Sequence, residues 1–275
     1  MSAEVVVITP TKGWQPIRLR HLWSFRELAY FLVWRDIKLR YKQTLLGTSW
    51  AVLQPAITTI VFTVIFGNWL GIGGGFGGPY ALFAFAAMLS WSFFSQGISQ
   101  GSKSLTNAAG VISRVYFPRL LLPIGSVLAF VLDLVIGAAL LLVLLPFYGY
   151  RPGLTLLAFP LFFLLLLVTT LGVTFVLGAA NAQYRDVQYV TPFLVQLWFF
   201  ATPVVYPVSK VPHGVLGVYS INPMVAVVSG FRWSFLGGAF PSTVELVASS
   251  IGSMVMFAVG ALYFRRLERT AVDVV

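Results

Sequence analysis

Six long apolar stretches alternate with polar segments along the chain. They cover residues 50–70, 79–100, 120–147, 154–180, 191–207 and 244–264. Each approaches the ~20 apolar residues with which an α-helix crosses the hydrocarbon core of a bilayer. Thr191-Pro192 offers an N-cap and a first-turn proline to the fifth stretch, and the glycine-rich segment 71–78 cannot continue the first. The pattern predicts an all-α polytopic membrane protein with six transmembrane helices.

The segment 211–236 is also apolar, but proline, glycine, asparagine and arginine residues interrupt it. A seventh span there would move the C-terminus to the opposite side of the membrane. We therefore predict two short re-entrant helices on the outer side before the last span, the second beginning at Asn222-Pro223 and ending at Gly237-Gly238. An ordinary surface loop is the alternative, although loops of this length with so few polar residues are uncommon.

The basic residues give the six spans an orientation. Fifteen of the 18 Lys and Arg residues fall on the side of the two termini, and only Arg151, Lys210 and Arg232 fall on the other. Cytoplasmic loops carry such an excess of basic residues, so both termini are predicted to be cytoplasmic. The chain then divides into a cytoplasmic N-terminal segment (1–49), a transmembrane domain (50–264) and a cytoplasmic tail (265–275).

The N-terminal segment contains the pattern of an amphipathic helix. At 3.6 residues per turn, its aliphatic face carries Leu22, Phe25, Leu28, Ala29 and Leu32. A neighbouring strip is aromatic and carries Trp23, Tyr30, Trp34 and Tyr41. This pattern predicts a helix that lies in the membrane interface, with aromatic rings at the depth of the lipid headgroups. A helix that only anchors the chain to anionic lipid has the same pattern.

The composition excludes several classes of protein. Only 9% of the 275 residues are charged and 58% are hydrophobic, whereas a soluble domain carries about 25% charged residues. The chain has no cysteine and two histidines, which excludes thiol chemistry and argues against a metal site. Residues 97–104 have the wrong spacing for a P-loop. We therefore expect a non-catalytic chain with no bound cofactor or metal, for which another subunit supplies any ATP hydrolysis.

Asp133 is the one acidic residue deep within a predicted span. A charge at the centre of a bilayer costs about 2.5 to 3.5 kcal/mol on insertion scales. Its side chain should therefore face protein or water, and we predict a structural or pore-lining role for it. The sequence does not identify its partner.

Aromatic residues make up 16% of the chain and crowd the second and fifth predicted spans. Their rings present apolar faces to the C–H groups of a sugar, so an aromatic lining suits a long glycan that slides through a channel. The candidate lining residues are Trp91, Phe94, Phe193, Trp198, Phe199, Phe200 and Tyr206. Aromatic residues that pack against lipid and against one another explain the same composition.

Four motifs carry a resemblance to a known family. The first is WRDIKLRYKQTLLGTSW at 34–50 followed by Gln54-Pro55, and the second is ISRVYFPRLLLP at 112–123. The third combines YRD at 184–186 with TPVVYP at 202–207, and the fourth combines NP at 222–223 with FRW at 231–233. Together they resemble the membrane-spanning subunit of the ABC transporters that export polysaccharides such as O-antigen, teichoic acid and capsule.

This resemblance implies an architecture and a set of partners. It implies the six spans, the interface helix and the outer re-entrant helices, in a homodimer that works with two copies of a separate nucleotide-binding ATPase. ATP and Mg²⁺ would be used by that partner. A cytoplasmic coupling helix around 107–118 would dock onto the ATPase. Its contacts would be Arg114, Val115, Tyr116, Phe117 and Pro118.

The resemblance also implies sites for the substrate. Arg35, Lys38, Arg40 and Lys42 would bind the diphosphate of a lipid-linked glycan, although anchoring to the cytoplasmic leaflet explains the same basic residues. A channel in the homodimer would carry the glycan, and re-entrant helices would form its outer gate. The gate residues would be Asn222, Pro223, Phe231, Arg232 and Trp233.

The function implied is the permease subunit of an ATP-driven exporter. It would move undecaprenyl diphosphate-linked O-antigen from the cytoplasm to the periplasm across the bacterial inner membrane, as part of lipopolysaccharide biosynthesis. An exporter of teichoic acid, capsule or a smaller lipid or drug has the same architecture. A secondary transporter or channel would show an inverted repeat or several ionisable residues at mid-membrane, and a membrane-embedded transferase would show a cluster of His or carboxylate residues. Neither pattern is present.

Overall fold

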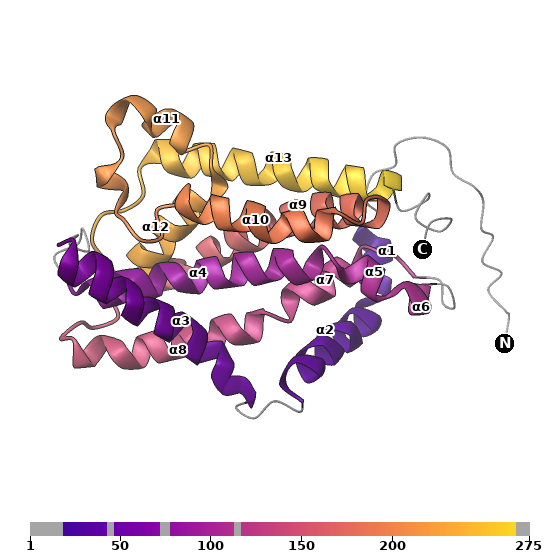
Figure 1. The fold of residues 1–275 in the computed structure, drawn as a ribbon, viewed down its shortest axis with the longest axis horizontal. Helices are drawn as coiled ribbons and strands as arrows, with labels where there is room; N and C mark the ends of the chain where they lie inside the picture. Colours follow the sequence, from indigo (N-terminus) through magenta and orange to yellow (C-terminus); the bar gives the residue numbers. More distant parts are fainter. Residues whose placement is uncertain (1–18, 43–46, 72–77, 113–116, 268–275) are drawn as a thin grey trace, which may run out of the picture.

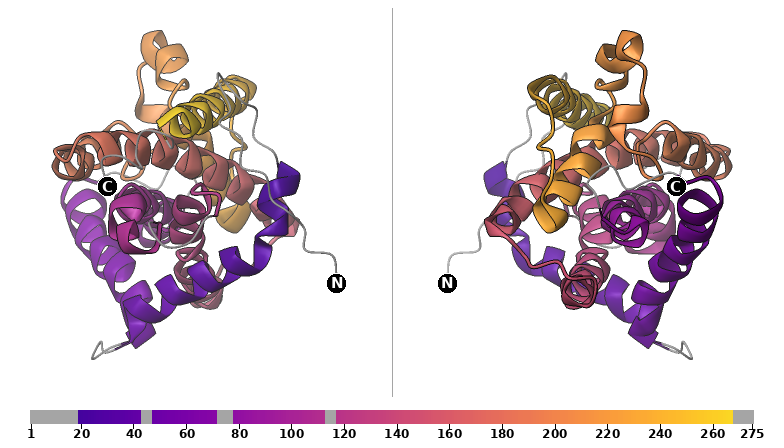
Figure 2. Two further views of the ribbon diagram at one scale, coloured as in Figure 1. Left: turned by 90° about the vertical axis from the view of Figure 1, so that its right-hand side faces the viewer. Right: turned by 90° about the vertical axis from the view of Figure 1, so that its left-hand side faces the viewer.

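A computed structural model describes residues 19–42, 47–71, 78–112 and 117–267. Within these residues every regular element is helical, which confirms the all-α fold. Figure 1 shows an elongated bundle in which the long helices lie roughly side by side. Viewed from its ends in Figure 2, helix α13 covers α9, and α9 and α10 cover α4, with α8 beyond it.

The long elements follow the predicted apolar stretches closely. They are α3 (Trp50–Phe62) with its π-helical continuation η2 (Thr63–Trp69), α4 (Tyr80–Gly101), α7 (Leu121–Leu128), α8 (Val131–Phe147), η3 (Leu154–Ala158), α9 (Phe159–Gln183), α10 (Val187–Phe200) and α13 (Thr243–Leu267). The shorter elements are α1 (Leu19–Ser24), α2 (Arg26–Tyr41), η1 (Gly47–Ser49), α5 (Ser104–Asn107), α6 (Ala109–Ile112), η4 (Val208–Lys210), η5 (His213–Val215), α11 (Leu216–Tyr219) and α12 (Pro223–Leu236).

Five of the helices in the described part of the chain are long and apolar enough to cross a membrane. Helix α10, in the place of the predicted fifth span, has 14 residues and is about 21 Å long, whereas the hydrocarbon core is ~30 Å thick. It nevertheless runs back along α9 toward the opposite end of the bundle (Figure 1). As a result, α1 and the last turn of α13 lie at the same end.

The predicted start of the fifth helix at Thr191-Pro192 is wrong. Helix α10 begins at Val187, so both residues lie inside it, and the Thr191 hydroxyl donates a hydrogen bond to the Val187 carbonyl at 2.7 Å. The start is set instead by the chain reversal after α9, where Tyr184 is extended and Asp186 precedes the first helical residue. The packing of α10 against α9 therefore outweighed the local preference of the Thr-Pro pair for the start of a helix.

Helix α4 forms the centre of the bundle. Nearly all its side chains from Leu82 to Phe94 are buried, and it packs against α3, α7, α8, α9, α10 and α12. A helix that is apolar all round is stable only where neighbours cover every face, so the rest of the fold is arranged around α4.

Helix α12 confirms the predicted bounds of the second short helix. The Asn222 side chain accepts a hydrogen bond from the Met224 N–H at 3.0 Å, as an N-cap does, and Pro223 occupies the first turn. The helix ends at Gly237, whose φ of 70° favours glycine. Most of α12 is buried against α4, α9 and α13. The residues before it form only η4, η5 and α11, and α11 projects from the bundle (Figure 2).

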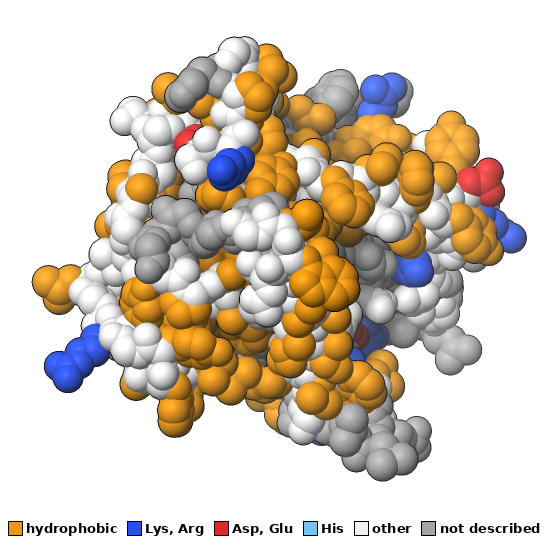
Figure 3. Space-filling model, turned by 60° about the vertical axis from the view of Figure 1, so that its left-hand side comes forward, with side chains coloured by type: hydrophobic (Ala, Val, Ile, Leu, Met, Phe, Trp, Pro, Cys, Tyr) orange, Lys and Arg blue, Asp and Glu red, His pale blue; other side chains and the backbone are white. Residues whose placement is uncertain are grey.

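The outer surface of the bundle is strongly apolar. Figure 3 shows hydrophobic side chains spread over one face with few charged groups between them. Helices α3, α10 and α13 contribute many of the exposed large hydrophobic residues of the described chain. A soluble monomer does not expose apolar surface of this extent, so it must be covered by lipid or by another chain.

Helices α9 and α13 make the closest approach in the bundle. A Cβ atom added to Gly260 would lie 2.3 Å from the Gly172 carbonyl oxygen, and one added to Gly172 would lie 2.7 Å from the Phe257 nitrogen. Beside this crossing, the Thr169 and Ser253 hydroxyls are hydrogen-bonded at 2.7 Å. Small residues with hydroxyl groups near them are a common way for membrane helices to approach closely.

We predict that Gly260→Ala destabilises the protein by about 1 to 3 kcal/mol, because the added methyl group forces two backbones apart. Gly178→Ala in α9 is a matched control, since its Cβ would meet no atom closer than 3.6 Å. The free energy of unfolding of the detergent-solubilised protein is the measurement. Equal stability of the two variants would show that the α9–α13 crossing tolerates separation.

Candidate functional site

The interface helix α2 is fixed to the bundle by a stripe of residues four apart. Leu32 is buried and packs over Gly125 of α7. One turn later Asp36 accepts a hydrogen bond from the Ser126 hydroxyl at 2.8 Å. A further turn on, Arg40 donates to the carboxylate of Asp133 at 2.7 Å. Residues at this spacing lie on one face of a helix, so α2 presents an apolar contact and two polar ones to the same neighbours.

Asp133 therefore has a structural partner. It lies in the first turn of α8, where the N-terminus of a helix favours a negative charge, and it accepts hydrogen bonds from the Arg40 guanidinium and the Tyr41 hydroxyl. Burial lowers the pKa of Arg40, and the carboxylate of Asp133 opposes that change. The pair satisfies a charge that would be costly alone in an apolar bundle.

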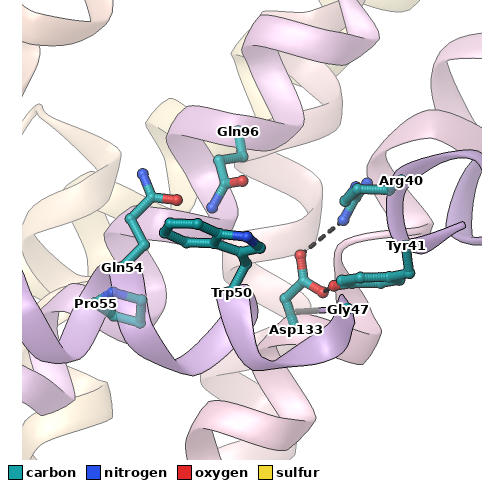
Figure 4. A pocket seen from close by; sticks show the side chains of 8 residues that line it. All are labelled: Arg40, Tyr41, Gly47, Trp50, Gln54, Pro55, Gln96 and Asp133. Carbon is teal, nitrogen blue, oxygen red and sulfur yellow. Dashed lines mark hydrogen bonds and ion pairs between the residues drawn. The ribbon is translucent and has the colours of Figure 1, made fainter. Parts of the chain in front are cut away.

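A polar pocket surrounds this ion pair at the elbow between α2 and α3 (Figure 4). Its volume is about 230 Å³. We call it the elbow pocket, and its lining residues are Arg40, Tyr41, Gly47, Trp50, Gln54, Pro55, Gln96 and Asp133. Figure 4 shows the Gln54 and Gln96 amides on the same side of the Trp50 indole, with the ion pair at its far end. Residues 40–55 are close in sequence, and the fold brings Gln96 of α4 and Asp133 of α8 to them.

The four predicted headgroup-binding residues have different environments. Arg40 is half-buried in the ion pair with Asp133, and the exposed Arg35 pairs with the neighbouring Asp36 at 2.8 Å. Lys38 and Lys42 are exposed, and the Lys38 ammonium lies 5.4 Å from the centre of the Trp34 ring. In the described structure, these two lysines make no ion pair, so they are the cations best placed for a lipid phosphate.

Four of the predicted channel residues form one aromatic cluster between α4 and α10. The ring centres of Trp91 and Phe199 are 5.3 Å apart, and those of Phe94 and Trp198 are 5.2 Å apart. Trp91 and Phe94 are buried in the bundle, so in this conformation they hold α10 against α4.

The remaining three channel candidates lie elsewhere. Phe193 and Phe200 are 59% and 62% exposed on the outer face of α10. Tyr206, beyond the helix, shares a hydrogen bond of 2.9 Å with the Tyr219 hydroxyl. Burial and this hydrogen bond raise the pKa of Tyr219, so its phenol stays protonated at neutral pH. Because they are exposed, Phe193 and Phe200 are available to a second chain or to a channel.

The buried Arg232 side chain holds the turn that follows α10 through hydrogen bonds. Its guanidinium donates hydrogen bonds to the carbonyls of Pro203 and Val204 at 2.6 Å and of Phe83 at 3.2 Å. It also lies 3.4 Å from the centre of the Phe83 ring. Backbone carbonyls take the place of a carboxylate, and the planar guanidinium suits both the three acceptors and the ring.

The Asn222 side chain also forms hydrogen bonds with this turn. Its amide nitrogen donates to the Ala201 carbonyl at 2.9 Å and to the Thr202 hydroxyl at 3.1 Å, and its oxygen accepts from the Trp198 indole at 2.9 Å. The predicted gate residues Asn222 and Arg232 therefore meet at 201–204. Their gate partners Pro223 and Phe231 are buried, and Trp233 packs against Phe240, with ring centres 4.7 Å apart.

The predicted coupling residues are only partly visible. Arg114, Val115 and Tyr116 lie outside the described residues. Phe117 is 5% exposed and belongs to the hydrophobic core, and Pro118 is half-buried. The short helices α5 and α6 lie at the same end of the bundle as α1 (Figure 1). The role of this segment as a docking surface stays a prediction.

Sequence reasoning missed the elbow pocket and its ion pair. The helical wheel placed Leu32 on the aliphatic face, but it did not include Asp36 and Arg40 with Leu32. Their four-residue spacing was the available signal. No comparable signal existed for Gln54 and Gln96, because they meet across two helices.

Known proteins resemble this chain over most of its length. A profile of the ABC-2 type transporter family matches residues 27–236. The O-antigen export system permease protein RfbA of Myxococcus xanthus is 30% identical over 93% of this chain and 98% of its own. An RfbA of Klebsiella pneumoniae is 23% identical, over 88% and 92% of the two chains. The polysialic acid transport protein KpsM of Escherichia coli is 22% identical, over 87% and 92%.

We predict that Arg40 and Asp133 are strongly coupled in stability. Arg40→Met or Asp133→Leu alone leaves a charge without its partner and should cost about 2 kcal/mol, less than the ~3–5 kcal/mol of a fully buried pair, because both side chains keep some solvent contact. The double variant should be more stable than either single one. A double-mutant cycle of unfolding free energies measures this, and additive losses would show that the pair does not act as a unit.

We also predict that Arg232→Lys destabilises the protein by about 1 to 3 kcal/mol, because an ammonium cannot satisfy three dispersed carbonyls or stack on Phe83. Arg151→Lys is the matched control, since Arg151 is exposed in the segment between α8 and η3, and its change should stay within about 0.5 kcal/mol. Thermal unfolding of both variants in one detergent is the measurement. Equal unfolding midpoints would mean that the stability of the turn at 201–204 does not depend on the guanidinium group of Arg232.

Proposed function

This chain belongs to the ABC-2 type transporter family, and on that premise we propose that it is the permease subunit of an exporter of lipid-linked polysaccharide. The observation that carries the proposal is the similarity to an O-antigen export permease over 93% of the chain, at 30% identity. The cargo would be an undecaprenyl diphosphate-linked O-antigen, moved outward across the bacterial inner membrane. The connection at 71–79 is too short for the large outer domain expected of a drug exporter with this architecture.

The proposed topology has six crossings with both termini in the cytoplasm. Helix α10 and the turn at 201–207 together make the fifth crossing, since α10 runs back along α9 (Figure 1). This topology places 15 of the 18 basic residues on the cytoplasmic side, as the positive-inside rule expects. Helix α12 would then be re-entrant, entering from the outer side with Arg232 satisfied inside the protein.

The proposed working unit is a homodimer with two ATPase subunits, which use ATP and Mg²⁺. Phe193, Leu197 and Phe200 form an exposed apolar stripe on α10. Facing a second copy across a central channel, these residues would give the glycan an aromatic wall without strong hydrogen bonds. Movement of the ATPases would reach the bundle through the segment around Arg114 and change the turn held by Asn222 and Arg232.

The test is co-expression with a candidate ATPase subunit, in cells that make the lipid-linked glycan but lack their own exporter. We expect glycan at the cell surface only when both chains are present and the ATPase is active. Arg114→Glu should reduce the ATPase recovered with the permease about tenfold, as loss of one charge-assisted contact would. Arg151→Glu, on the outer side in the proposed topology, should leave recovery unchanged. Phe117→Ala is unsuitable, because Phe117 belongs to the core.

Two outcomes would contradict the proposal. Surface glycan that appears without the permease would assign export to another protein. Unchanged recovery of the ATPase with Arg114→Glu, together with normal export, would remove the coupling role from this segment and leave the export role in place.

A further inference from the structure

We propose that the elbow pocket binds the first sugar ring of the lipid-linked glycan, the one attached to the diphosphate. The inference rests on the proposed function and adds a recognition site to it. Four elements meet in this pocket, namely the end of α2, the start of α3, the cytoplasmic half of α4 and the first turn of α8. It therefore lies where the interface helix joins the first span, and a lipid in the cytoplasmic leaflet can reach this position.

The charge of the elbow pocket favours a neutral ligand. Arg40 is the cation of the lining and Asp133 is the anion, and the two are paired at 2.7 Å, so the lining has no net charge. A diphosphate would need an excess of cations and would compete with Asp133 for Arg40. The exposed Lys42 follows Tyr41 directly at the end of α2. A diphosphate would fit beside Lys42 at the rim, with its sugar directed inward.

The side chains of the pocket match the chemistry of a pyranose. The Trp50 side chain is half exposed, and its indole presents an apolar face to the C–H groups of a sugar ring. The Gln54 and Gln96 amides lie next to that ring on one side, and each offers both hydrogen-bond donors and an acceptor (Figure 4). Within the described structure, neither amide is engaged in a side-chain hydrogen bond, so both can pair with hydroxyl groups.

The size of the pocket limits the ligand to a short one. Its volume of about 230 Å³ lies below the ~300–1,000 Å³ of pockets that enclose drug-sized molecules. One sugar ring is the appropriate scale, whereas a glycan chain is too large. The elbow pocket would thus recognise how the glycan begins and ignore how long it is, a useful property for an exporter of polymers.

Binding by the full-length permease in nanodiscs tests the proposal with two probes. One is undecaprenyl diphosphate, and the other is undecaprenyl diphosphate carrying a single N-acetylglucosamine. We expect the double variant Gln54→Leu/Gln96→Leu to bind the sugar-bearing lipid about tenfold more weakly and the sugar-free lipid as the wild type does. Two lost hydrogen bonds to the sugar account for a change of that size. Gln100→Leu, an exposed glutamine of α4 outside the pocket, is the matched control.

The outcomes separate this inference from the proposed function. An equal loss for both lipids, or no loss for either, would overturn the sugar site while export by the wild type upholds the permease role. Wild-type protein that neither binds the sugar-bearing lipid nor exports glycan would count against both. If the double variant fails to fold, photocrosslinking of the wild type by a glycolipid with a diazirine on its sugar decides. Labelling of residues 47–55 or Gln96 supports the site, and labelling confined to other helices overturns it.

Discussion

Charged groups inside an apolar helix bundle need partners, and this requirement shapes both ends of the protein. Water is absent from the hydrocarbon region, so each buried charge or backbone polar group must be satisfied by the protein itself. Where α2 ends, Asp133 meets Arg40 and Tyr41, and the result is electrically neutral. Beside the turn after α10, Arg232 meets backbone carbonyls, and its positive charge remains. The contacts of Asp133 attach α2 to the bundle, and those of Arg232 fix the turn after α10.

The contacts of Asp133 and of Arg232 both hold segments that a transport cycle would need to move. The interface helix and α3 meet at the elbow pocket, where the ion pair joins α2 to α8. Asn222 and Arg232 both hydrogen-bond to the turn at 201–204, so α12 and α10 cannot shift independently. Between them α4 is a rigid centre, since nearly all of its side chains are buried. Polar contacts at the ends of a rigid apolar centre are easier to exchange than the packed core itself.

The aromatic residues show how one composition serves two purposes. Trp91 and Phe94 pack against Trp198 and Phe199 within the bundle, which is the ordinary packing explanation of their abundance. Phe193 and Phe200 lie on the outer face of the same α10 helix and remain exposed. The two sets differ in exposure, although the rings of the adjacent Phe199 and Phe200 touch, with their centres 5.4 Å apart. Of these aromatic residues, the exposed Phe193 and Phe200 therefore remain the candidates for contact with a sugar.

The sequence by itself determined the all-α fold, the position of most apolar helices and the bounds of α12. These depend on local rules: the length needed to span a bilayer, an asparagine N-cap and a glycine with positive φ. Tertiary structure decided where α10 begins, which basic residue pairs with Asp133, and which aromatic residues are buried. Those outcomes depend on contacts between residues distant in sequence, such as Arg40 with Asp133 or Arg232 with Val204. A residue's type and its periodicity fix the face that it occupies, but only the packed fold determines what lies opposite that face.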